Sequence, residues 1–209
     1  MSGKSNFRKY FPLSLFAILF LLNPWVYKLI NQQLFIFILL VFCTILLIVK
    51  FSGKNFTKAT IAFFILLTLV QIKSVKISNV YKSTPAEIDL QTTRMNYYEP
   101  RFARLGYYLE KQTITILFYK VEKNFFDTID LNLYFPNYFN LVTLPFLLIG
   151  LYNLFQSKNI NKYLLLSSIL ILTLIGVNGK SGPFLIFPFF GLAIYLGVES
   201  MLKKIWTLK

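Results

Sequence analysis

Long runs of apolar residues are the feature that most limits what this chain can fold into. The run Leu34–Phe51 contains one charged residue, Lys50, near its end. A helix of that length, rising about 1.5 Å per residue, almost crosses the roughly 30 Å hydrocarbon core of a bilayer. Apolar residues make up 56% of the 209-residue chain, whereas soluble domains contain about 45–50%. Because the excess is gathered into such runs, we expect an all-α membrane protein.

Six apolar runs predict a polytopic bundle of about six transmembrane helices. The first run follows basic residues, as in a signal sequence, but no small-x-small cleavage site comes after it. We therefore expect a retained first span, kinked near Pro24. The fifth run is short for a span, which leaves two possibilities. It forms an ordinary span, which we favour, or half of a re-entrant pair with the sixth run. The six runs are residues 10–30, 34–51, 59–75, 139–155, 163–177 and 183–202.

Lysine and arginine residues in the short connections set the expected orientation. Eleven of them fall on one side of the six-span arrangement, and only Lys28 and Lys180 fall on the other. Cytoplasmic loops carry such an excess, so we expect a multi-pass protein of the cell membrane with both termini in the cytoplasm. Lys73, Lys76 and Lys82, close to the third span, oppose this assignment. The eleven residues are Lys4, Arg8, Lys9, Lys50, Lys54, Lys58, Lys158, Lys162, Lys203, Lys204 and Lys209.

The net charge of +14 has a membrane explanation as well. The excess positive charge sits in the short connections between apolar runs, where anionic lipid headgroups are a sufficient partner for it. We therefore expect membrane lipids as partners and no nucleic acid.

Residues 77–138 interrupt the apolar runs and divide the chain into three parts. The segment is too long for a simple connection and is neutral overall, with seven acidic and seven basic residues. From Arg101 to Phe126 apolar residues recur at three- to four-residue steps, which predicts one or two amphipathic helices along the membrane surface. The expected orientation makes this segment extracytoplasmic. It separates an N-terminal membrane part (1–76) from a C-terminal membrane part (139–209).

A dense group of charged and aromatic residues in this outer segment forms the candidate site. Guanidinium groups bind phosphates bidentately, so its arginines could hold a phosphate or pyrophosphate at the headgroup level. Glu99 could serve as a base and is the one catalytic candidate. In the simpler interpretation the arginines bind lipid phosphates and the tyrosines form an interfacial belt. The group consists of Arg94, Tyr97, Tyr98, Glu99, Arg101 and Arg104.

Two other polar patterns also have simpler structural interpretations. Asp127 and Asp130 lie three residues apart, and Glu122 precedes them, so a carboxylate pair for metal or acid–base work is conceivable. A helix end with Asp130 as its cap or turn residue explains the pattern as well. Asn178-Gly-Lys-Ser-Gly-Pro lacks the earlier glycine of a phosphate-binding loop, so we expect a tight turn between spans.

The apolar runs of this chain contain few residues that could act as catalysts or metal ligands. The chain has no histidine and a single cysteine, Cys43, inside an apolar run, so we expect no metal site and no cofactor. Cys43 itself is expected to be a small buried apolar residue. Glu199 is the only acid in an apolar run, and Lys203, four residues on, is its expected ion-pair partner.

Three stretches between residues 94 and 154 carry a family resemblance. They are Arg-Met-Asn-Tyr-Tyr-Glu-Pro-Arg-Phe-Ala-Arg-Leu (94–105), Leu-Asn-Leu-Tyr-Phe-Pro-Asn (131–137) and Leu-Pro-Phe-Leu-Leu-Ile-Gly-Leu-Tyr (144–152). Their order resembles the middle of polytopic GT-C-type glycosyltransferases, of the dolichyl-phosphate-mannose mannosyltransferase and ArnT-like kind, and of related bacterial membrane proteins. That family carries an acidic residue in its first outer loop, where this chain has Asn31-Gln32-Gln33. No catalytic residue is therefore carried over.

Three functional hypotheses follow. The first is a non-catalytic or accessory membrane protein whose outer segment binds lipid headgroups or a membrane-protein partner. The second, which the resemblance implies, is a glycosyltransferase-like enzyme using a polyprenyl-phosphate-linked sugar, with Glu99, Arg101 and Arg104 at its site. The third is a small transporter, disfavoured because no span carries a clear polar pair or matched broken helices. A large cavity at residues 94–104 favours the enzyme, and a flat surface helix there favours the first hypothesis.

Overall fold

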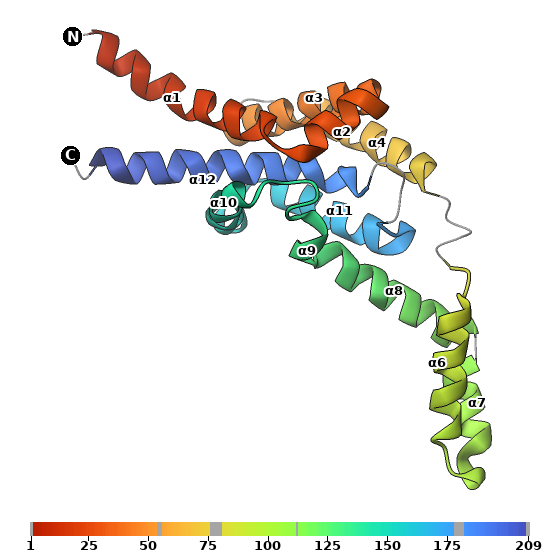
Figure 1. The fold of residues 1–209 in the computed structure, drawn as a ribbon. Helices are drawn as coiled ribbons and strands as arrows, with labels where there is room; N and C mark the ends of the chain where they lie inside the picture. Colours follow the sequence, from red (N-terminus) through yellow and green to blue (C-terminus); the bar gives the residue numbers. More distant parts are fainter. Residues whose placement is uncertain (1, 54–55, 76–80, 112, 178–181, 208–209) are drawn as a thin grey trace.

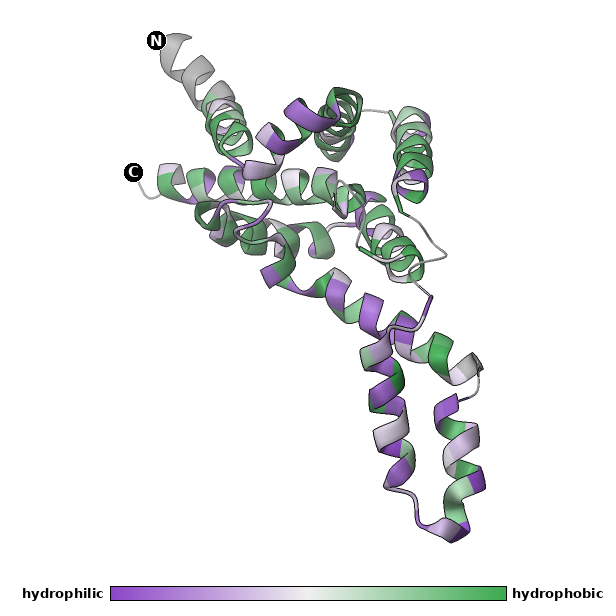
Figure 2. Ribbon diagram, turned by 45° about the vertical axis from the view of Figure 1, so that its right-hand side comes forward, coloured by the Kyte–Doolittle hydropathy of each residue, from purple (hydrophilic) through white to green (hydrophobic). Residues whose placement is uncertain are grey.

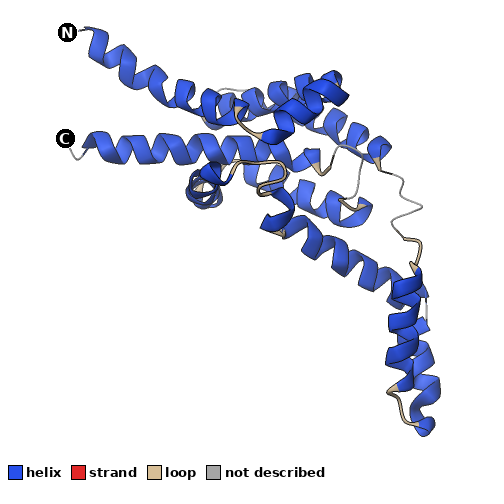
Figure 3. Ribbon diagram, in the orientation of Figure 1, coloured by secondary structure: helices blue, strands red, loops and turns tan. Residues whose placement is uncertain are grey.

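The protein is helical wherever its regular structure is described. A computed structural model describes residues 2–53, 56–75, 81–111, 113–177 and 182–207. Within these ranges every regular element is a helix and no strand occurs, as Figure 3 shows. The expected all-α class is therefore confirmed.

Four long apolar helices form the body of the molecule (Figure 1). They are α1 (Ser2–Leu21), α3 (Leu34–Phe51), α4 (Thr57–Ser74) and α12 (Phe187–Thr207). Helix α12 packs against α1 and α3, and α3 packs against α4. From Phe187 to Val198 nearly every residue of α12 is buried, including residues on all sides of the helix. A helix that is apolar all round belongs at the centre of a bundle, and α12 occupies that place.

The first apolar run is broken where the sequence predicts a kink. Helix α1 ends at Leu21, and α2 (Pro24–Gln32) starts with Pro24 in its first turn, bent by 63° from residues 11–21. Asn23, fully buried between them, donates its side-chain amide to the carbonyl oxygens of Leu19 and Phe20. Its Oδ1 accepts from the backbone N–H of Asn140, 2.9 Å away. The kink is thus tied to a segment more than a hundred residues further along the chain.

A second bend lies in the C-terminal part. The 3₁₀ turn η2 (Leu141–Thr143) leads into α10 (Leu144–Gln156), and α11 (Asn161–Ile175) follows at an angle of 113° to the residue 141–156 segment. Figure 1 views α10 nearly along its axis, whereas α12 runs across the picture, so the two helices cross steeply. Small residues permit this crossing. A Cβ on Gly150 would overlap the Ala193 carbonyl oxygen, and one on Gly197 would overlap that of Phe146.

Among the described residues, three helical segments are long and apolar enough to cross a bilayer, and five if each bent pair counts as one span. The three are Leu34–Phe51, Thr57–Ser74 and Phe184–Thr207, which includes the 3₁₀ turn η3 (Phe184–Ile186). The sequence suggested a re-entrant pair from the fifth and sixth runs, but the sharp bend joins the fourth and fifth. The total of six spans stays a prediction.

A polar arm leaves the bundle at the end where α4 finishes (Figure 1). It consists of α6 (Pro85–Asn96), η1 (Pro100–Phe102), α7 (Ala103–Lys111) and the first half of α8 (Thr113–Ile129). Figure 2 shows hydrophilic residues concentrated there, while the bundle helices are mostly hydrophobic. Helix α8 returns along α11, and α9 (Leu131–Tyr134) joins the bundle. Since α1 begins and α12 ends at the far end of the molecule, the arm lies opposite both.

Candidate functional site

The arm begins with a capping box. Thr84 precedes α6, its hydroxyl accepts from the backbone N–H of Glu87, and the Glu87 carboxylate accepts from the backbone N–H of Thr84. Pro85 occupies the first helical position, where its missing N–H costs nothing. The sequence Thr-Pro-Ala-Glu carries this signature, so α6 was open to prediction.

Glu87 also joins α6 to α8 through two lysines. Its carboxylate lies 2.5 Å from Lys120 Nζ and 3.6 Å from Lys123 Nζ, and Lys120 donates as well to the Lys82 carbonyl oxygen. Burial by itself would raise the pKa of Glu87. The hydrogen bonds from Lys120 and Thr84 and the positive charge of Lys120 outweigh it and lower that pKa to about 2. Because α6 contains no fully buried residue, this cluster is a principal attachment of the helix.

Acid should release α6 from α8. A carboxyl group with a lowered pKa stabilises the fold above its unfolded value of about 4.3, and this stabilisation is lost as pH falls towards about 2. Spin labels at Thr92 and Phe118 should therefore move apart between about pH 4 and about pH 2. A Glu87→Gln variant has no such proton to bind and should lack the step. An identical step in both proteins would contradict this role for Glu87.

A groove of about 320 Å³ lies beside this cluster, between α6 and α8. Three basic and two acidic residues line this groove, so its surface carries both positive and negative charge. The residues that line it are Ser83, Glu87, Leu90, Gln91, Arg94, Ile116, Tyr119, Lys120, Glu122, Lys123 and Phe126.

Arg94 belongs to this groove and also to a second pocket. That pocket measures about 260 Å³, and Arg94, Tyr97, Tyr98 and Glu110 line it. The Arg94 guanidinium lies 5.1 Å from the centre of the Tyr119 ring. Its Nη1 is 3.8 Å from Glu110 Oε2. Tyr98, in the connection that follows α6, packs against α7, because a Cβ on Gly106 would meet its ring. We call this the tip pocket.

The structure brings together three of the six residues singled out from the sequence. Arg94, Tyr97 and Tyr98 line the tip pocket, and Tyr97 is 83% exposed. Glu99 and Arg101 form an exposed ion pair of 2.6 Å, with 62% and 72% of their side chains accessible. Arg104 is also exposed and lines neither the groove nor the tip pocket.

Two buried charged residues of the arm, Glu110 and Lys120, were missed as site residues. Both fall off the apolar stripe that the sequence shows in this segment, and neither was singled out as a site residue. In the structure, polar residues of α8 face the protein and its large apolar residues lie on the outside. Its buried side includes Lys120, Asn124 and Thr128, which follow at four-residue steps. Its exposed side includes the large apolar residues Leu117, Phe118, Phe125, Phe126 and Ile129.

The remaining candidates have structural roles. Asp130 caps α9 by accepting from the Asn132 backbone N–H at 2.9 Å, as the simpler interpretation expects. Glu199 and Lys203 form the expected ion pair, at 2.6 Å, and Cys43 is buried. Of the suspected phosphate-binding loop, residues 178–181 lie outside the described part. Among described residues no group of three or more histidine, cysteine, aspartate or glutamate residues could hold a metal ion.

Comparison of the chain with protein-family models, with curated proteins and with solved structures gave no match. The resemblance to GT-C-type glycosyltransferases therefore stays a prediction.

Proposed function

We propose that this chain is a multi-pass membrane protein whose arm lies at the outer headgroup level and binds lipid headgroups. The observation that carries the proposal is the reversed polarity of α8, which buries Lys120, Asn124 and Thr128 and exposes phenylalanines. Water does not favour such an arrangement, whereas contact with acyl chains does. The exposed aromatic side of α8 is therefore assigned to the membrane.

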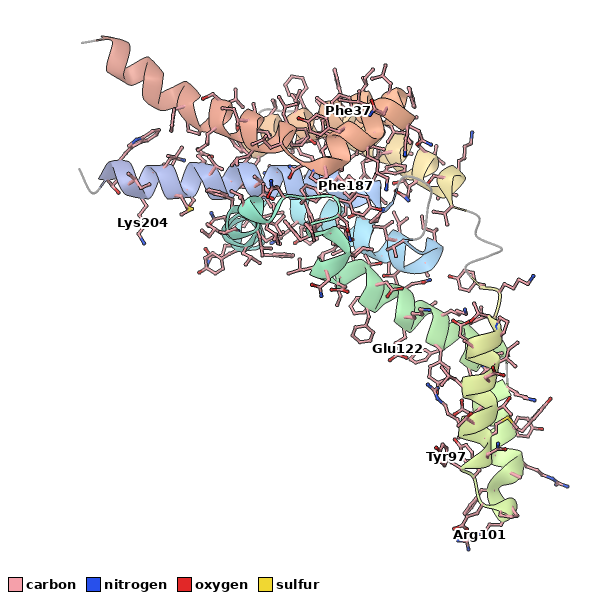
Figure 4. All side chains as sticks on the ribbon, viewed as in Figure 1. Phe37, Tyr97, Arg101, Glu122, Phe187 and Lys204 are labelled. Atoms are coloured by element: carbon pink, nitrogen blue, oxygen red, sulfur yellow. The ribbon has the colours of Figure 1, made fainter. Side chains whose placement is uncertain are left out.

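The geometry of the arm agrees with that placement. It leaves the bundle where α4 ends and runs across the direction of α12 (Figure 1). If α12 crosses the bilayer, helices α6 and α7 of the arm lie roughly parallel to the membrane surface. Tyr97 and Glu122 both lie in the angle between arm and bundle (Figure 4), which is the side that would face lipid. Arginine and tyrosine are suited to the headgroup layer, because guanidinium binds phosphate and a phenol is amphipathic.

The other hypotheses have less support among the described residues. Glu99, the base that a glycosyltransferase would use, lies on the surface paired with Arg101. The two pockets of the arm, about 320 Å³ and 260 Å³, lie at and below the lower end of the roughly 300–1,000 Å³ range of small-molecule sites. A membrane-protein partner covering the exposed face of α8 is the main competitor, and the experiment below distinguishes it.

The depth of α8 in the bilayer tests the proposal. In a Cys43→Ser background, single cysteines at Phe118 and Phe126 would carry a fluorophore in protein reconstituted into vesicles. Lipids brominated near the upper acyl chain should quench both labels several-fold more strongly than a matched label at Asp89 on α6. The expectation rests on the exposure of the two phenylalanines, 65% and 58%.

Two results would overturn the assignment. Quenching at positions 118 and 126 no stronger than at 89, together with ready access to a water-soluble quencher, would place α8 in water. Protection of both labels from lipid and water alike would mean that a protein covers this face.

A further inference from the structure

The tip pocket contains a buried carboxylate oxygen with no hydrogen-bond partner. The Glu110 side chain is 7% exposed, and its Oε2 receives no hydrogen bond. Arg94 Nη1 is 3.8 Å away, which is too far for a hydrogen bond but close enough for electrostatic attraction. A buried acceptor without a donor destabilises the fold, and more so when it is charged. A ligand donor can satisfy this oxygen once the side chains that cover it shift, because the oxygen itself has almost no accessible surface.

The other walls of the pocket define what kind of donor fits. The tyrosine rings 97 and 98 line the pocket beside Glu110, and an aromatic face next to a carboxylate attracts a cation. Arg94 lines the same pocket with 49% of its side chain exposed, so its guanidinium can still bind an anion. The pocket thus presents one negative and one positive group, 3.8 Å apart at their nearest atoms.

We propose that the tip pocket binds the phosphoethanolamine headgroup of a zwitterionic phospholipid. The ammonium group donates to Glu110 Oε2 and packs against the tyrosines, and the phosphate binds Arg94. This inference rests on the proposed function, since it names the lipid class that the arm recognises. The pocket volume of about 260 Å³ suits a headgroup, whereas drug-sized ligands occupy pockets of about 300–1,000 Å³.

The unpaired oxygen also decides between the two common zwitterionic headgroups. A primary ammonium has three N–H donors, and one of them satisfies Glu110 Oε2. A quaternary ammonium, as in phosphocholine, has none and leaves the oxygen unpaired. A headgroup without an amine, such as phosphoglycerol, brings its negative phosphate to Arg94 and has no cation for Glu110. The expected order of binding therefore places phosphatidylethanolamine first.

Lipid retention by the full chain tests this order. Delipidated protein in mild detergent would be mixed with short-chain phosphatidylethanolamine, phosphatidylcholine or phosphatidylglycerol, and bound lipid would be measured by native mass spectrometry. Wild-type protein should retain phosphatidylethanolamine most strongly. Glu110→Gln should weaken that lipid about tenfold, because it removes the charge that binds the ammonium. It should weaken phosphatidylcholine less, because choline loses electrostatic attraction but no hydrogen bond, and it should not weaken phosphatidylglycerol.

Glu99→Gln is the matched control, since Glu99 is an exposed glutamate of the same arm that does not line the pocket. It should behave as wild type. Arg94→Gln is a second variant that removes no buried group, and it should weaken all three lipids, because each carries a phosphate. Equal retention of the three lipids by wild type would overturn the inference. So would identical behaviour of the Glu110 and Glu99 variants.

A soluble headgroup separates this inference from the proposed function. Competition by sn-glycero-3-phosphoethanolamine as effective as by the lipid would show that the free headgroup suffices and that the bilayer is not the required source. If α8 is quenched by brominated lipid but ethanolamine is not preferred, the proposed function stands and the tip-pocket inference fails. If α8 lies in water while the headgroup still binds through Glu110, the reverse holds.

Discussion

A Gly150→Ala substitution is expected to unfold the contact between α10 and α12. The alanine Cβ would overlap the Ala193 carbonyl oxygen, which belongs to the backbone of the most buried helix. Rotamer changes cannot relieve a clash with backbone, so the helices must move apart. We expect a loss on the order of 3 kcal/mol, the upper part of the usual range for overpacking. In a helix without such a clash, alanine is about 1 kcal/mol more favourable than glycine. A decrease in the free energy of unfolding would therefore point to the clash with α12.

Thermal unfolding in detergent, followed by size-exclusion chromatography, measures this loss. The midpoint for Gly150→Ala should fall by roughly 10 °C relative to the unchanged protein. Leu148→Ala, on the exposed side of the same helix, is the control and should change the midpoint little. A Gly150→Ala protein as stable as the control would show that α10 does not cross α12 at this point.

The apolar runs made much of the helical layout predictable. The run at residues 34–51 coincides with α3, and the kink expected near Pro24 lies between α1 and α2. These features follow from local rules, because hydrophobic length and proline geometry do not depend on distant residues. The steep crossing of α10 could not be found this way. It depends on Gly150 meeting Ala193, more than forty residues away, and a single apolar run does not reveal its partner.

The candidate site was predictable only in part. Arg94, Tyr97 and Tyr98 stood out by their local density, and the structure places them in one pocket. Glu110 joins them because α6 and α7 form a hairpin, and its burial depends on that pairing. The burial of Lys120 on α8 could not be predicted, for another reason. An amphipathic pattern identifies two faces of a helix, but it does not say which solvent each face meets when a bilayer and polar neighbours are both present.

Gln71 is expected to hold α4 against the segment that leads into α12. Its side chain is fully buried. Nε2 donates to the Gly182 carbonyl oxygen at 3.2 Å, and Oε1 accepts from the Leu185 backbone N–H at 3.1 Å. The N–H of Leu185 lies in the first turn of η3, where intrahelical partners are lacking. Gln71→Leu keeps a similar volume and leaves the Leu185 N–H unpaired, whereas the Gly182 carbonyl oxygen keeps its second donor, the Phe184 backbone N–H at 3.0 Å. The expected loss is about 2 kcal/mol.

This prediction has a control on the same helix. Thr68 donates only to Phe64 within α4, so Thr68→Val removes a polar group without breaking a contact between helices. The midpoint for Gln71→Leu should fall by roughly 5 °C, and that for Thr68→Val should fall much less. Cysteine pairs placed on α4 and η3 should also crosslink more slowly in the Gln71 variant, because the Gln71 hydrogen bonds that join these elements are lost. Equal midpoints for the two variants would mean that water or another group satisfies the Leu185 N–H. Gln71 would then contribute packing alone.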